Sequence, residues 1–206
     1  APGGCGDGDL GSGDFGIGRV GGRAAPDRSL RHSVGVRSWT VASAVIEAGV
    51  LSGSTAEPDH VLLVQNLRRN GSTDWTTPGG VIDEGESALG GLVREVVEET
   101  GLLVAVWGGL LYEIRVQAPE LGWDLRVEVH RAVTVTGELA IGADPDGIVI
   151  GSAWASTPQC VDLLGDAHPW VREPLVDWLT QRWTDHRTYE YLIGGSTLEE
   201  ITVERR

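Results

Sequence analysis

The chain has 206 residues, enough for one domain with a substantial core and some length to spare. Its formal net charge of −14 argues against nucleic acid and against an anionic membrane surface as partners, because both repel an acidic protein. Cys5 and Cys160 are too few and too far apart to indicate a disulfide framework or a zinc site. Since the sequence has no apolar run of about 18 residues and no signal-peptide pattern, we expect a cytoplasmic protein without a membrane partner.

Residues 1–31 form a separate compositional zone. Ten of the first 22 residues are glycine, interspersed with aspartate, serine and arginine. Such a segment buries little apolar surface and loses much entropy on ordering. The composition therefore predicts a glycine-rich flexible tail over residues 1–31 and a single domain over residues 32–206.

Strand patterns begin after this tail. Residues 34–50 carry alternating and β-branched residues and predict one long strand or two short ones. Residues 61–64, Val-Leu-Leu-Val, predict a short buried strand. Residues 65–78 are polar and predict a loop that leads to the next helix.

Residues 80–102 carry the most informative pattern, in which an acidic helix follows a Pro-Gly-Gly turn. Glu98 and Glu99 stand three and four positions after Glu95, so the three glutamates share one face of the helix. Arg94 stands four residues before Glu98 and can hold its carboxylate by a charge-assisted bond. The opposite, apolar face should pack against a sheet. Carboxylates converging beside a glycine loop suit a hard divalent cation, and such sites commonly serve phosphate chemistry.

Three glycines mark this helix. Gly101 stands where a left-handed helix end is expected. Gly90 and Gly91 fall in the helix interior, where each glycine costs about 1 kcal/mol relative to alanine. Close approach to another backbone would explain this pair.

The second half of the chain alternates strands with one late helix. A helix is predicted over residues 170–183, starting near Pro169 or, because proline disrupts a helix interior, at Pro174. The expected strands are residues 102–116, 123–135, 147–155 and 189–193, with a turn at 117–122. Strands on both sides of a helix, followed by a late helix, predict an α/β (α+β) fold with a mixed sheet between helices.

The acidic segment has the pattern Gly, five residues, Glu, seven residues, Arg-Glu-aliphatic, one residue, Glu-Glu, one residue, Gly-aliphatic. This pattern resembles the Nudix box of the Nudix hydrolase family (MutT-like). Every defined position is met, by Gly80, Glu86, Arg94, Glu95, Val96, Glu98, Glu99, Gly101 and Leu102. With each residue type used at roughly 5–8%, seven fixed identities would coincide by chance on the order of 10⁻⁸ per starting position.

The resemblance implies an α/β/α sandwich around a mixed, curved sheet, and it implies roles for the box residues. By that match Glu98 and Glu99 would be the principal metal ligands, and Glu95 a further ligand or the base that activates water. The Gly80 carbonyl would complete the coordination of the metal. Arg94 would orient a glutamate rather than touch the substrate.

Many Nudix proteins add a carboxylate from a loop some 35–40 residues beyond the box. Glu138 is the first candidate for this metal ligand. Asp144 and Asp146 on the same loop, and Glu128 on the preceding strand, remain alternatives. Glu138 is equally compatible with a solvent-facing turn at the end of a strand.

Substrate contacts are weakly indicated. Arg68 and Arg115 are candidates for phosphate contact and Trp75 for stacking on a base. Other candidates of the same two kinds are Arg37, Arg69, Arg126, Tyr112 and Trp123. For each of them a surface or core role is the more frequent outcome.

The resemblance implies hydrolysis of a diphosphate bond in a nucleoside diphosphate linked to another moiety, by water activated on Mg²⁺ or, as a substitute, Mn²⁺. Nucleoside triphosphates, ADP-ribose and sugar nucleotides are all open as the small-molecule substrate. The alternatives are a catalytically idle module that senses a nucleotide and an isomerase of isoprenoid diphosphates. A homodimer is compatible with the eight tryptophans but not indicated by them.

Overall fold

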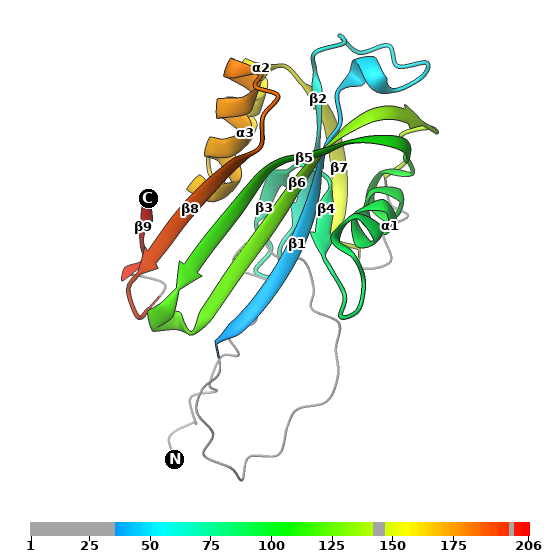
Figure 1. Cartoon of the computed structure of the whole chain (residues 1–206). Helices are drawn as coiled ribbons and strands as arrows, with labels where there is room; N and C mark the ends of the chain where they lie inside the picture. The colour runs from blue at the N-terminus through cyan, green and yellow to red at the C-terminus, as the bar shows by residue number, and fades with distance from the viewer. Residues whose placement is uncertain (1–35, 142–146, 198–199) are drawn as a thin grey trace, which may run out of the picture.

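The computed structural model describes residues 36–141, 147–197 and 200–206, and the tail predicted at 1–31 lies outside them. Within these ranges the strands form a six-stranded and a three-stranded sheet (Figure 1). The large sheet has the order β4-β1-β6-β5-β8-β9, made of Gly79–Val81, Arg37–Val45, Trp123–Thr136, Leu103–Ala118, Arg187–Gly194 and Thr202–Arg205. It is mixed, because β1 is parallel to β6 and β5 is parallel to β8, whereas its other neighbours are antiparallel.

The small sheet and the helices complete the fold. The small sheet has the order β3-β2-β7, made of Thr73–Thr76, Val61–Leu67 and Val149–Ala155. The α-helices of the described ranges are α1 (Ala88–Thr100), α2 (Thr157–Leu163) and α3 (Pro169–Gln181), and two short 3₁₀ helices cover Ala48–Val50 and Pro119–Leu121. No helix in these ranges is long and apolar enough to cross a membrane.

Helices cover the sheets from opposite sides, with α1 on one side and α2 and α3 on the other (Figure 1). On the α1 side, Ala42 and Ala44 of β1 meet Leu92 and Val96 of the helix in one buried cluster. The larger cluster lies on the other side, where the strands pack against α3. This arrangement confirms the predicted α/β/α sandwich around a mixed sheet.

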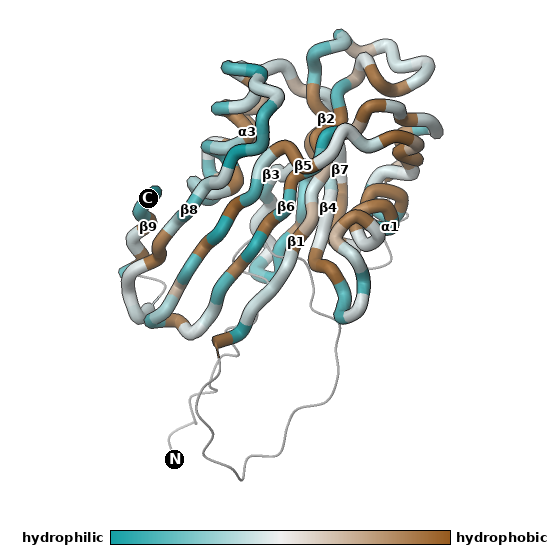
Figure 2. The backbone as a smooth tube through the Cα atoms, in the orientation of Figure 1, coloured by the Kyte–Doolittle hydropathy of each residue, from teal (hydrophilic) through white to brown (hydrophobic). Residues whose placement is uncertain are grey.

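Strand alternation decides which side chains enter each layer. Along β6 buried and exposed residues alternate over much of the strand, and Figure 2 shows the matching alternation of hydrophobic and hydrophilic residues. Successive side chains of a strand point to opposite faces, so one strand supplies both the core and the surface. The expected strands at 102–116 and 123–135 are confirmed as β5 and β6.

The predicted loop at 65–78 is wrong, because β2 continues to Leu67 and β3 follows as its hairpin partner. The polar residues of this hairpin bond one another. Arg68 donates to both carboxylate oxygens of Asp74, each at 2.7 Å, and Asn66 donates to Thr76 Oγ1 at 2.9 Å. Side-chain pairs across the hairpin thus satisfy residues whose polarity alone favours a loop.

Two helices differ from expectation. Helix α3 begins at Pro169 and contains Pro174, so the alternative start at Pro174 is wrong. Helix α2 was not predicted from sequence, and it begins with a capping box formed by Ser156 and Gln159. At seven residues it is too short for its periodicity to be recognised.

A nearly buried ion-pair cluster joins the strands to α3. Glu47, which follows β1, is 8% exposed. It accepts from Arg131 of β6 at 2.6 Å and from Arg182, the C-cap of α3, at 2.5 Å. Arg182 also lies over the ring of Trp178, 4.5 Å from its centroid. One carboxylate therefore ties two strands and a helix together.

Replacing Glu47 by alanine should lower the free energy of unfolding by about 1–3 kcal/mol, because both guanidinium groups lose their counter-charge while only partly exposed. Urea unfolding followed by tryptophan fluorescence measures this change. Glu57→Ala, at an exposed acidic position, is the control and should change the unfolding free energy by no more than about 0.5 kcal/mol. Equal stability of the two variants would contradict the proposed role of the cluster.

Candidate active site

The box helix α1 is held at both ends by local contacts. Ser87 caps its N-terminus, because the side chain accepts from the Gly90 N–H at 3.1 Å. Gly101 ends the helix in the left-handed region with φ 71°, as predicted. These caps satisfy backbone groups that a helix end otherwise leaves unpaired.

The glycine pair inside the helix lies against the loop that precedes it. A Cβ on Gly91 would stand 2.6 Å from Ile82 Cδ1 and 3.0 Å from Glu86 Oε2. A Cβ on Gly90 would stand 2.9 Å from the capping oxygen of Ser87. The close approach expected for these glycines is therefore present, but side chains make it rather than a second backbone.

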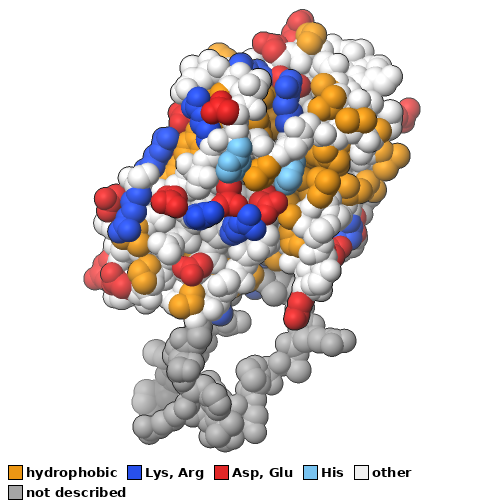
Figure 3. Space-filling model, viewed as in Figure 1, with side chains coloured by type: hydrophobic (Ala, Val, Ile, Leu, Met, Phe, Trp, Pro, Cys, Tyr) orange, Lys and Arg blue, Asp and Glu red, His pale blue; other side chains and the backbone are white. Residues whose placement is uncertain are grey.

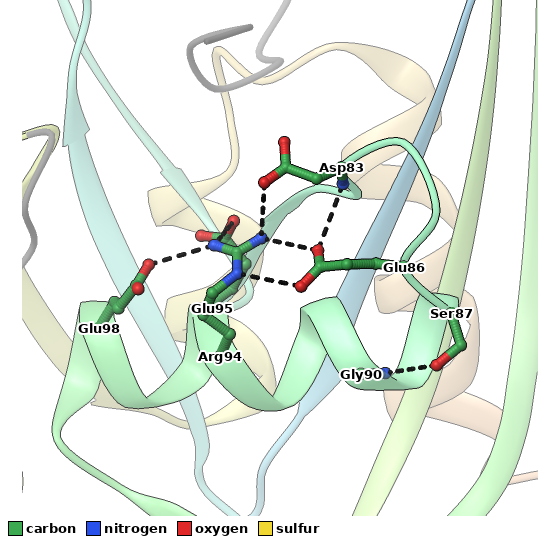
Figure 4. Close-up of polar contacts among 7 residues, drawn as sticks. All are labelled: Asp83, Glu86, Ser87, Gly90, Arg94, Glu95 and Glu98. Atoms are coloured by element: carbon green, nitrogen blue, oxygen red, sulfur yellow. Dashed lines mark hydrogen bonds and ion pairs between the residues drawn. The ribbon is translucent and has the colours of Figure 1, made fainter.

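Arg94 is the centre of the acidic cluster (Figure 4). Its guanidinium donates to Glu95 at 2.8 Å, to Glu98 at 3.2 Å and to Glu86 at 3.1 Å, and it stands 3.9 Å from Asp83. The predicted bond between Arg94 and Glu98 is confirmed. Hydrogen bonding to Glu86 raises the pKa of Arg94, and the same bond lowers the pKa of Glu86. One guanidinium group thus bonds three carboxylates and holds them close together.

The backbone of β4 lies directly against the carboxylates of Glu99 and Glu95. The Gly79 N–H donates to Glu99 Oε2 at 2.8 Å, and Glu99 is only 8% exposed. A Cβ on Gly80 would stand 2.6 Å from the carboxyl carbon of Glu95, so any side chain there would displace the Glu95 carboxylate. The turn and the helix therefore meet at the position where the resemblance places the Gly80 carbonyl and the glutamates.

The donor set fits a hard divalent cation, since it consists of carboxylate and carbonyl oxygens. Within the described ranges, however, no three acidic, histidine or cysteine side chains are already gathered as a metal site. Glu98 accepts from Arg94, and Glu99 from the Gly79 N–H. A bound cation would compete with these contacts.

The candidates for a carboxylate outside the box lie in different places. Glu138 follows β6 and is exposed, and its carbonyl oxygen lies 3.0 Å from the position of a Cβ on Gly101, beside the C-terminal end of α1. Glu128 of β6 is paired with Arg126 at 2.9 Å. Asp144 and Asp146 lie outside the described residues. The role of Glu138 as a metal ligand therefore stays a prediction.

A cavity opens beside Gly79, between the large sheet and the start of α3. We call it the apolar chamber, and its walls include Val41, Ile114, Leu125, Val127, Tyr112 and Trp170. A second cavity, the polar chamber, adjoins it through Thr76 and Val171, and its lining includes Arg68, Asn70, Ser72, Asp74 and His168. The two chambers therefore lie next to each other, and Gly79 lines the apolar one and donates to Glu99 of the acidic cluster.

The residues predicted to contact the substrate lie in different parts of the structure. Arg68 lines the polar chamber and is paired with Asp74. Trp75 packs against the large core cluster and is not among the lining residues of either chamber. The structure thus places Arg68, but not Trp75, at the wall of a cavity.

Arg115 lies on the opposite face of the large sheet from the apolar chamber, because its neighbour Ile114 lines that chamber. It belongs to a surface network that also includes Arg126, Glu113 and Glu190, on a face where Figure 3 shows acidic and basic side chains side by side. Burial raises the pKa of Glu113, but hydrogen bonds from Arg126 and Arg115 outweigh that effect and lower it.

The walls of the apolar chamber were not recognised as a site from sequence. The alternation along β6 predicts that Leu125 and Val127 face a core. The alternation does not predict a cavity in this core. The cavity forms only where side chains of β1, β5 and α3 come together. Tyr112 was considered only as a stacking residue.

Comparisons with known proteins agree with this geometry. The family model of the Nudix domain matches residues 47–188. No curated protein matches the chain in sequence.

Three solved structures share the fold. The chain is 20% identical to the MutT protein from Bacillus halodurans, with 81% of this chain and 97% of that chain covered and a TM-score of 0.53. The E. coli ORF135 protein is 19% identical, with 73% and 96% covered and a TM-score of 0.55. The MutT protein from Methanosarcina mazei Go1 is 18% identical, with 75% and 98% covered and a TM-score of 0.54.

The matched segment contains the complete box, and it spans the chain from the end of β1 to the start of β8. It therefore holds the acidic cluster, the glycine turn against it and most of the chamber walls. The chain belongs to the Nudix hydrolase family.

Proposed function

We propose that the protein hydrolyses a diphosphate bond in a nucleoside diphosphate linked to another moiety, using Mg²⁺ or Mn²⁺. A nucleoside triphosphate, ADP-ribose and a sugar nucleotide all contain such a bond. The observation that carries the proposal is the contact of Gly79 and Gly80 with Glu99 and Glu95 at the edge of the apolar chamber. This contact sets a hard-cation donor set beside a cavity that can take an apolar ring.

Each box residue has a distinct task in this proposal. Glu98 and Glu99 hold the cation, assisted by the Gly80 carbonyl and by Glu138. Glu95 is a further ligand or the base that removes a proton from the attacking water. Arg94 positions Glu95 and Glu98, to which it already donates. When bound, the cation neutralises the diphosphate and lowers the pKa of water.

The nucleobase is proposed to occupy the apolar chamber. Gly79 connects this chamber to the acidic cluster, because it lines the first and bonds Glu99 of the second. Ligand sites are commonly apolar with a few placed polar groups, which describes these walls. The polar chamber beyond Thr76 would receive polar groups at the far end of the substrate.

The idle nucleotide sensor is the less favoured function. Every glutamate of the box pattern is present, and Arg94 and the Gly79 N–H hold them in place. Three neighbouring carboxylates repel one another, and this repulsion has to be offset. A module that only senses a nucleotide has no need of them.

Glu98→Gln should reduce turnover by about 100-fold or more without unfolding the protein, because a neutral amide is a poor ligand for a hard cation. Release of phosphate and nucleotide is measured on a panel of nucleoside triphosphates, ADP-ribose, sugar nucleotides and dinucleoside polyphosphates. Glu84→Gln, at an exposed position of the preceding loop, is the control and should retain wild-type turnover. Near-normal turnover of Glu98→Gln would remove Glu98 from the metal site. Nucleotide binding without turnover in the wild type would favour the sensor.

Removal of divalent cations with a chelator should abolish turnover, and added Mg²⁺ or Mn²⁺ should restore it. A second readout does not depend on activity. Cation binding to the folded protein should raise the midpoint of thermal unfolding as the cation concentration rises. The rise should be smaller in Glu98→Gln and in Glu99→Gln than in wild type. An equal rise in all three proteins would place the cation outside the box.

A further inference from the structure

Large apolar side chains are exposed on α1 and on the neighbouring ends of β5 and β6. Among the described residues nine large apolar side chains are exposed, and five of these nine belong to this one region. We call the five the apolar patch, and they are Leu89, Val93, Leu103, Val106 and Val133, each 39–54% exposed. The other four are spread over β2, β7, α2 and the residue before β1.

One buried cluster lies beneath this patch and joins its elements. Leu92 and Val96 of α1 belong to the cluster, and Val104 and Trp107 of β5 pack against it. The helix and the leading end of β5 are therefore neighbours. Figure 3 shows hydrophobic side chains gathered over the part of the molecule where Figure 1 places α1 and these strand ends. Contiguous apolar surface of this kind is typical of a protein–protein contact.

The segments that carry the patch contain no charged residue. This holds for residues 88–93 of α1, for residues 100–112, which include the leading end of β5, and for residues 132–137 at the end of β6. The whole chain has a formal net charge of −14, so two copies of it repel each other. A surface without charges is where two such copies can meet at the lowest electrostatic cost.

The leading end of β5 also has an open strand edge. Strand β8 pairs with β5 only over Tyr112–Gln117, so in the described part of the chain residues 103–110 pair with β6 alone. Four register shifts interrupt the pairing of β5 with β6 between Val104 and Tyr112. Irregularities of this kind keep a strand edge from adding another strand. Contact through the side chains of the patch is therefore favoured over extension of the sheet.

We propose that the apolar patch is the interface of a homodimer, in which it contacts the same patch of a second copy across a two-fold axis. Two-fold dimers are the commonest oligomers of soluble proteins. Transient interfaces between different proteins are about as polar as the rest of the surface, whereas homodimer interfaces are more apolar, and charged residues are depleted from the interface core. The composition of the patch therefore indicates a second copy rather than a transient partner.

The oligomeric state of the full chain, measured by sedimentation velocity over a wide range of protein concentration, tests this proposal. With rising concentration the wild type should approach twice the chain mass of 21.9 kDa. Val106→Glu adds a negative charge to the patch of each copy. It should raise the dissociation constant of the dimer by roughly 10-fold or more, because like charges brought together across an interface oppose association.

Leu89→Glu tests the same interface from α1. Leu89 lies in the first turn of the helix, where an acidic side chain suits the helix dipole, so the variant should fold. It should weaken the dimer as Val106→Glu does. The control is Val161→Glu on α2, at a valine that is 42% exposed outside the patch, and it should dimerise like the wild type. Far-UV circular dichroism checks that each variant is folded.

Two results would overturn the proposal. One is a wild type that stays monomeric at every concentration, including the case in which the patch binds a different molecule. The other is a dimer whose dissociation constant is unchanged in folded Val106→Glu and Leu89→Glu. The patch shares no residue with the acidic cluster or with the lining of either chamber, so the proposal does not rest on the proposed function.

Discussion

The contact between the glycine turn and the box helix is the constraint on which the rest of the site depends. Gly80 has no side chain, so the β4 backbone lies directly against the Glu95 carboxylate. The adjacent Gly79 N–H then reaches Glu99, and β4 pairs with β1 in the large sheet. A helix that carries the carboxylates is thereby fixed to the sheet whose other face forms the chamber. The apolar chamber and the acidic cluster thus meet at Gly79, which lines the first and bonds Glu99 of the second.

The positive charge of Arg94 offsets the repulsion among the glutamates of this cluster, in a chain whose net charge is −14. Arg94 bonds three glutamates at once, and each of these bonds is charge-assisted. The arginine is partly exposed, so water still reaches the cluster and screens it. The carboxylates are therefore held close together by one arginine and remain accessible to water.

The two faces of the large sheet carry different kinds of side chain, because neighbouring residues of a strand point in opposite directions. On β5, Ile114 lines the apolar chamber, whereas Glu113 and Arg115 join a charged surface network. Tyr112 belongs to the chamber side as well, two residues before Ile114. A shift of one residue in register would exchange these roles, so the long pairing of β5 with β6 protects the site as well as the fold.

The sequence by itself determined the features that depend on residues close together in the chain. The box helix, its glycine end and the Arg94–Glu98 pair follow from spacing along one helix, where neighbours are three or four residues apart. The box pattern also indicated the family and the sandwich. Only the tertiary structure decided that residues 73–76 form a strand, that Arg115 faces away from the chamber, and that a cavity adjoins Gly79. These features depend on contacts between segments far apart in the chain, and the pattern within any one segment does not contain them.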